Sequence, residues 1–153
     1  IKTFVGNWEF GLGEAIYCMM DYFENVGDVG KNKGFLDDET VVRECLKIRL
    51  YDGLFRSSDN IMRNILVNNS GELLSIDEGD MFGKRELVFN RRGDWCKKNV
   101  SAEILQSVLE EILENKEEKV KGVQNLMLGY RLDYASEFKA RFENYRVIVQ
   151  SEW

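Results

Sequence analysis

The hydrophobic positions in the first third of the chain follow helical spacing. A helix is predicted from Gly11 to Asn25, because apolar side chains recur there on one face, at Ile16, Met19, Met20 and Phe23. The next segment, residues 25–35, contains three glycines and predicts a loop. A second helix is predicted to run from this loop to about Phe55. Its first residue is capped by Asp37 or Asp38, since either carboxylate can accept a backbone N–H at a helix start.

The last third of the chain is also predicted to be helical. Ser101 is expected to cap a helix with apolar residues at helical spacing, which are Ile104, Leu105, Val108, Leu109, Ile112 and Leu113. The charged stretch 114–122 ends or bends this helix. Residues 134–145 predict the last helix, and residues 145–153 fit either a terminal strand or a helical tail.

The middle of the chain breaks this helical pattern. Residues 65–67 and 73–76 are short, apolar runs, and the segment between them contains Gly71. Short runs separated by such a turn predict a β-hairpin. The fold class is therefore predicted to be mostly α with a small β-hairpin (α+β). Residues 1–153 are expected to form a single domain, since domains commonly have about 100–150 residues.

The composition is that of a globular protein. Hydrophobic residues make up 44% and charged residues 31% of the chain, which argues against disorder. No apolar run approaches the ~20 residues that cross a bilayer, and the first residues lack the layout of a secretion signal. A cytoplasmic location and no membrane span are expected. The chain also begins without methionine, so it is expected to be processed, trimmed or part of a longer protein.

Charge and residue usage exclude several classes of function. The net charge is −6 with no block of lysine and arginine, so duplex DNA is not expected as a partner. Local basic pairs, Lys84–Arg85, Arg91–Arg92 and Lys97–Lys98, are either scattered surface charge or one positive patch. The chain has no histidine, which excludes Ser-His-Asp and Cys-His chemistry and disfavours zinc. The three cysteines are expected to be reduced, buried thiols.

Oxygen ligands around the predicted hairpin, within residues 54–80, are the main candidates for chemistry. Asp59 precedes Asn64 by five positions, and Asp77 follows Asn64 by thirteen. Asn64 enters the first strand and Asp77 leaves the second, so both are expected at the open end of the hairpin. Mg²⁺ binds oxygen ligands and usually takes one or two from carboxylates. The pattern therefore predicts a magnesium site formed by Asn64 and Asp77, with Asp59 nearby.

These residues resemble motifs of the protein-kinase-like superfamily. The step from Asp59 to Asn64 is similar to the kinase catalytic loop, and Asp77-Glu78-Gly79 is similar to the Asp-Phe-Gly element. The words "DNIMRNILV" and "SIDEGD" look closest to the atypical branch, which includes the phosphoinositide kinases. The specific match covers about thirty residues.

The resemblance implies the C-terminal lobe of an atypical kinase and Mg-ATP-dependent phosphoryl transfer to a protein or lipid hydroxyl. Asp59 would be the catalytic residue, which orients or deprotonates the acceptor. Asn64 and Asp77 would bind metal, and Gly79 would help to bind the nucleotide. The implied cofactors are Mg²⁺ and ATP. In the family pattern Arg and His precede the catalytic Asp, whereas this chain has Ser58 and Ser57 there.

Two alternatives stay open at the level of sequence. One is a catalytically inactive pseudokinase-like module, whose apolar upper face binds a protein partner or a second copy of the chain. No glycine-rich strand-turn-strand of an N-terminal lobe is recognised before residue 37, and that absence favours the inactive module. The other alternative is an unrelated helical domain, in which Asp59 caps a helix and Asp77 is an acid in a turn.

Overall fold

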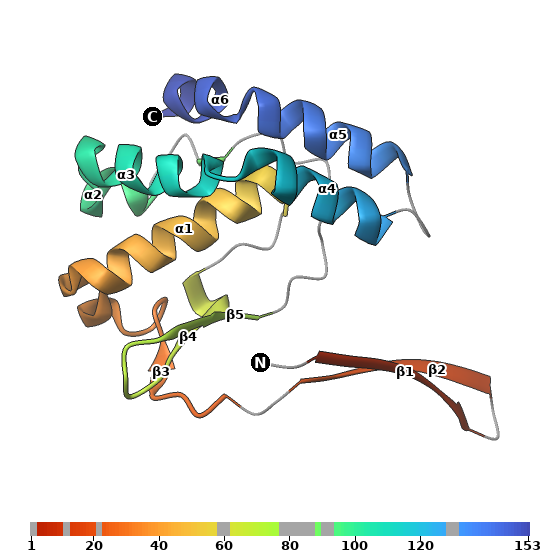
Figure 1. Cartoon of the computed structure of the whole chain (residues 1–153). Coiled ribbons are helices and arrows are strands. Elements are labelled where there is room, and N and C mark those ends of the chain that lie inside the picture. Colours follow the sequence, from red (N-terminus) through yellow and green to blue (C-terminus); the bar gives the residue numbers. More distant parts are fainter. Residues whose placement is uncertain are drawn as a thin grey trace.

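The long helix α1 (Glu39–Phe55) lies between the other helices and the sheet (Figure 1). The computed structural model describes residues 3–10, 13–20, 23–57, 62–76, 88–89, 94–127 and 132–153. Helices cover one side of α1, and the described strands lie on the other side. The described part of the chain is thus mostly helical with a small antiparallel sheet, which confirms the α+β prediction at this coarse level.

Helix α1 begins where the sequence predicted. Asp38 is its N-cap, and the Asp38 carboxylate accepts a hydrogen bond from the Thr40 N–H at 2.8 Å. The preceding 3-10 turn, η1 (Lys33–Asp37), is capped in turn by Asn32. At the other end Arg56 adopts a left-handed conformation, with φ of 57°, which stops the helix.

Removing the Asp38 cap is expected to destabilise the protein by about 1 kcal/mol, because replacing an N-cap Asp with alanine leaves a helix N–H without its acceptor. Urea unfolding of Asp38→Ala measures this loss. The neighbouring Asp37→Ala is the matched control, since Asp37 is equally exposed but lies within η1. Equal losses in the two variants would show that the cap contributes nothing specific.

A three-stranded antiparallel sheet contains the predicted hairpin. Its order is β3 (Gly27–Asp28), β4 (Ile65–Val67) and β5 (Leu73–Ser75), and Ile65 pairs with Ser75. At the turn, the Asn68 side-chain oxygen accepts the N–H groups of Ser70 and Glu72, both at 2.9 Å. The hairpin prediction is confirmed. The alternative, a helix capped by Asp59 that continues through Ile65 and Leu66, is wrong, because these two residues lie in β4. Residues 25–35, predicted as a loop, also contain β3 and part of η1.

The predicted helix from Gly11 to Asn25 is wrong. The chain instead forms an antiparallel hairpin of β1 (Thr3–Phe10) and β2 (Gly13–Met20), which pair in full from Thr3 with Met20 to Phe10 with Gly13. In Figure 1 this hairpin lies on the sheet side of the molecule. Two paired strands therefore do precede residue 37, although no glycine-rich strand-turn-strand is recognised there from the sequence.

Within the described residues, five helices follow the sheet. Helix α3 is capped by Ser101, whose hydroxyl accepts the Ile104 N–H, as predicted. Asn115, with φ of 51°, separates α3 from α4, so the charged stretch 114–122 ends one helix and begins another. The predicted last helix is followed by one more helix, so residues 145–152 are helical and do not form a strand. The bounds are α2 (Cys96–Asn99), α3 (Ala102–Leu113), α4 (Lys116–Met127), α5 (Leu132–Glu143) and α6 (Tyr145–Glu152).

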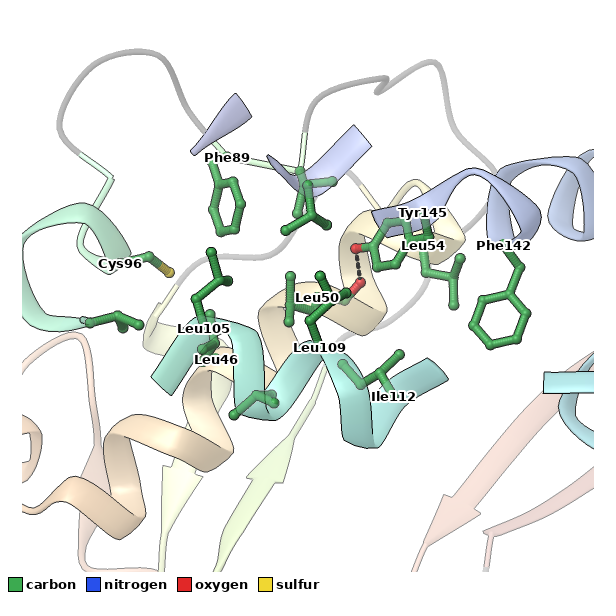
Figure 2. Packing of buried hydrophobic residues seen from close by; sticks show 14 of the residues in the cluster. Leu46, Leu50, Leu54, Phe89, Cys96, Leu105, Leu109, Ile112, Phe142 and Tyr145 are labelled. Atoms are coloured by element: carbon green, nitrogen blue, oxygen red, sulfur yellow. Dashed lines mark hydrogen bonds between the residues drawn. The ribbon is translucent and has the colours of Figure 1, made fainter. Parts of the chain in front are cut away.

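The main core lies between α1, α3 and the C-terminal helices (Figure 2). The Tyr145 hydroxyl donates a hydrogen bond to the Leu50 carbonyl and so ties α6 to α1. Gly53 is required at this contact, because a Cβ there would lie 2.8 Å from the Tyr145 hydroxyl. The residues that α1 and α3 contribute to this core include Leu46, Leu50, Leu54, Leu105, Leu109 and Ile112.

A second, smaller core joins the sheet to α1. Its buried members are Val29, Val41, Cys45, Ile65 and Val67. Because side chains alternate along a strand, the burial of Ile65 and Val67 directs Leu66 to the opposite face of the sheet. Within the described residues, no helix has the length and apolar character needed to cross a membrane.

Candidate functional site

Asn64 lies at the open end of the hairpin, as predicted. It is the last residue of η2 (Met62–Asn64), directly before β4. Its carbonyl accepts the Ile76 N–H at 2.8 Å, so positions 64 and 76 are joined across the hairpin. The other predicted site residues, Asp59, Asp77 and Gly79, lie outside the described residues.

The approach to Asn64 is held in place by the chain segment at β3. The Gly30 N–H donates to the Met62 carbonyl, and the Val29 N–H donates to the Ile65 carbonyl, both at 3.0 Å. A Cβ at Gly30 would lie 2.8 Å from the Arg63 backbone nitrogen, so only glycine permits this close approach. These contacts fix the backbone on both sides of Asn64.

Asn64 lines a small pocket between the hairpin end and α1. Polar groups from α1 and from β5 also line it, together with the Trp95 ring; the α1 and β5 residues are Cys45, Arg49, Asp52 and Ser75. Asn64, Arg49, Asp52 and Ser75 each have a further interaction within the protein, so the pocket is lined by polar groups that have partners. Such an environment holds side chains in defined positions.

A buried ion pair supports the wall of this pocket. Arg49 Nη2 lies 2.9 Å from Asp94 Oδ2, and the two side chains are only 6% and 1% exposed. Asp94 also accepts the Cys96 N–H at 3.2 Å through its other oxygen. The pair thus links the middle of α1 to the start of α2, close to Trp95.

Cys45 and Cys96 are not candidates for nucleophilic chemistry. Cys45 and Cys96 are both free and fully buried, as predicted for these thiols. Burial raises the pKa of Cys45 to about 12, and burial also raises the pKa of Cys96. Both groups are therefore neutral thiols near pH 7, whereas the reactive form of cysteine is the thiolate.

An apolar surface lies on the outer face of the sheet, beside Asn64. Leu66 pairs directly with Leu74, and both are half-buried, although Ile65 and Val67 on either side of Leu66 are buried. Ile76, two residues after Leu74, is half-buried as well. We call Leu66, Leu74 and Ile76 the outer face. The outer face presents apolar side chains. In a sheet that helices cover on one side only, the other side is usually polar.

A carboxylate borders the outer face. Asp28 on β3 pairs with Leu66, and its side chain accepts the Lys31 N–H at 2.8 Å and lies 3.3 Å from the Lys31 ammonium. Desolvation by burial favours the neutral acid, but the Lys31 N–H and ammonium outweigh it, and the pKa of Asp28 is lowered. Asp28 is therefore a permanent negative charge at neutral pH.

The remaining charged candidates give no second site. Lys97 and Lys98 are exposed on α2, whereas Lys84, Arg85, Arg91 and Arg92 lie outside the described residues, so a shared positive patch stays a prediction. The acidic side chains of residues 110–118 are exposed, as expected for a solvated helix face. Across the described ranges, no three residues among cysteines and acids are grouped to hold a metal ion.

The Arg49–Asp94 pair was missed at the level of sequence. The sequence feature that could have revealed the pair is Arg49, a cation within the mostly apolar stripe of α1. A charge on a buried helix face requires a partner. The partner lies 45 positions away, and no local pattern marks Asp94. Comparison with protein-family models, with curated proteins and with solved structures found no match for this chain.

Proposed function

We propose that the chain is the lower lobe of an atypical kinase-like phosphotransferase, which transfers a phosphoryl group from Mg-ATP to a protein or lipid hydroxyl. The observation that supports this most is the backbone hydrogen bond between Asn64 and Ile76 at the open end of the hairpin. Asp77 directly follows Ile76 in the sequence, and the proposal places its carboxylate beside Asn64.

The chain's residues take distinct parts in this proposal. Asn64 and Asp77 offer an amide oxygen and a carboxylate, which suit Mg²⁺, and the metal would neutralise charge on the phosphates. Asp59 precedes Asn64 by five positions and would accept the proton of the acceptor hydroxyl. The close contacts of Gly30 with residues 62–63 would hold the catalytic segment in position.

The outer face gives the nucleotide a surface for its base. Nucleotide and cofactor sites are mostly apolar with a few polar groups, and Leu66, Leu74 and Ile76 lie beside Asn64 in this manner. The β1–β2 hairpin lies on the same side of the molecule as the sheet and offers part of an upper wall (Figure 1). The rest of an upper lobe would come from a further segment or a partner.

Mg-ATP is expected to stabilise the protein against heat, because a ligand that binds only the native state at 100 times its Kd adds about 2.7 kcal/mol. For a domain of this size that corresponds to a rise in Tm of about 5–10 °C. Asn64→Ala is expected to reduce the rise severely, since it removes one proposed metal ligand. Differential scanning fluorimetry with ATP, with and without Mg²⁺, measures both effects.

The matched control is Asn69→Ala, which changes an exposed asparagine in the turn at the opposite end of the hairpin. Its shift with Mg-ATP should equal that of the parent. If the parent itself shows no shift at millimolar Mg-ATP, or if Asn64→Ala and Asn69→Ala shift equally, the proposed nucleotide site is wrong.

A second function is favoured by the same half-buried leucines, Leu66 and Leu74. In an inactive, pseudokinase-like module, the outer face would bind an apolar protein surface, a second copy of the chain included. The test is the variant Leu74→Glu. It should abolish self-association, measured by analytical ultracentrifugation, or it should abolish capture of the protein partner. We place either function in the cytoplasm, since Cys45 and Cys96 are free and such thiols persist in a reducing compartment.

A further inference from the structure

A groove lies between the C-terminal end of α1 and the helices α4 and α5, which lie side by side at that end of the molecule (Figure 1). Its volume is about 280 Å³, near the lower limit of typical small-molecule sites. Among the described residues, none lines both this groove and the pocket at Asn64. The described lining includes Tyr51, Phe55, Lys119, Gly122, Phe138 and Phe142.

Aromatic rings dominate the wall of this groove. The Phe55 and Phe138 rings stack with their centroids 5.0 Å apart, and Phe138 and Phe142 stack at 5.6 Å. Tyr51 adds a fourth ring to the lining. Rings that are already packed against each other form a rigid wall, and an aromatic ligand gains favourable offset or edge contacts with such a wall.

Gly122 keeps the groove open. It lies within α4, where glycine is unfavourable compared with alanine, and a Cβ built at this position meets no atom within 4 Å. Packing inside the protein therefore does not require glycine at this position. The missing side chain instead leaves space in the groove.

Lys119 supplies a charge at the groove. Its ammonium donates to the Ile112 carbonyl at 2.8 Å and to the Glu111 carbonyl at 3.3 Å, and both acceptors are neutral. Among the described residues that line the groove, Lys119 alone is charged. The ammonium has three N–H donors, so it can also donate to an anionic ligand while it contacts the last turn of α3.

We propose that this groove binds a small aromatic carboxylate, with the ring against Phe55 and Phe138 and the carboxylate beside Lys119. The rings favour a flat apolar ligand, and Gly122 leaves room for it. The Lys119 ammonium favours a ligand with one negative charge. The site is independent of the proposed nucleotide site, so either proposal can fail without the other.

Isothermal titration calorimetry with naphthoate tests this assignment on the full chain. The parent should bind naphthoate with a Kd in the millimolar range or below. Gly122→Leu should abolish binding by filling the groove, and Gly122→Ala should weaken it in part. Neither variant should lower the Tm, because both replace a helix-interior glycine with a better helix former. Lys119→Gln should weaken binding about two- to fivefold, as expected for one partly exposed charge contact.

The controls separate the parts of the proposal. Lys121→Gln removes an exposed lysine of the same helix that does not line the groove, and it should leave binding unchanged. Naphthalenemethanol lacks the charge. It should bind the parent more weakly than naphthoate does, whereas the two ligands should bind Lys119→Gln equally. Unchanged binding in Gly122→Leu would overturn the site. Tighter binding of decanoate than of naphthoate would overturn the aromatic class of ligand.

Discussion

Asp94→Ala is expected to lower the free energy of unfolding by about 3–5 kcal/mol, the loss typical when one partner of a buried ion pair is removed. The Asp94 side chain is only 1% exposed, and its removal leaves the Arg49 guanidinium without this carboxylate in a place that water does not reach. Asp94 also accepts the Cys96 N–H, so the start of α2 loses a contact as well.

Chemical denaturation of Asp94→Ala, followed by circular dichroism, measures this loss. Glu110→Ala is the comparison, because Glu110 pairs with Arg146 on the exposed surface, where ion pairs contribute about 0–1 kcal/mol. The double variant Arg49→Met with Asp94→Leu should recover part of the stability, since it removes both buried charges together. A loss below 1 kcal/mol for Asp94→Ala would contradict the buried position of the pair.

Leu109→Ala is expected to cost about 3 kcal/mol, within the range of about 2–5 kcal/mol for large-to-small changes in a core. Leu109 is fully buried on α3, in the cluster that joins this helix to α1 (Figure 2). Its removal leaves a cavity between two helices that are held by many other contacts, so the space cannot close completely.

The same unfolding experiment with Val147→Ala is the control. Val147 is 67% exposed on α6, and its truncation should change stability by less than about 0.5 kcal/mol. Comparable losses at Leu109 and Val147 would mean that the α1–α3 interface is not the centre of the fold.

The elements with strong local signals were predictable from the sequence. Asp38 and Ser101 cap α1 and α3 because their side-chain oxygens accept the N–H groups of residues two and three positions later in the chain. The β4–β5 hairpin was predictable for the same reason, since its turn is made by Asn68 and Gly71, which act within four residues. Each of these features depends on a few adjacent residues.

The β1–β2 hairpin was not predictable from its periodicity. Ile16, Met19, Met20 and Phe23 have the spacing of a helix face, and a short apolar run does not distinguish a helix from a strand. The structure is decided by the pairing of eight positions of β1 with eight of β2. Pairing of this kind depends on a second segment, so the pattern of one segment alone gave the wrong element.

The candidate site was predictable only in part. The spacing of Asn64 and the hairpin placed Asn64 at the strand ends, and its hydrogen bond with Ile76 confirms that position. The polar surroundings of Asn64 come from Arg49 and Asp52 on α1 and from Ser75 on β5. Their convergence depends on how α1 packs against the sheet, and sequence spacing does not contain this information.

The most direct test of the proposed function is a crystal structure of the chain with Mg²⁺ and a non-hydrolysable ATP analogue. The proposal predicts a metal ion within about 2.0–2.1 Å of the Asn64 side-chain oxygen and of an Asp77 carboxylate oxygen, the usual Mg²⁺–oxygen distance. It also predicts the Asp59 carboxylate on the same side of the hairpin. A nucleotide bound elsewhere, or Asn64 and Asp77 pointing to opposite surfaces, would contradict it.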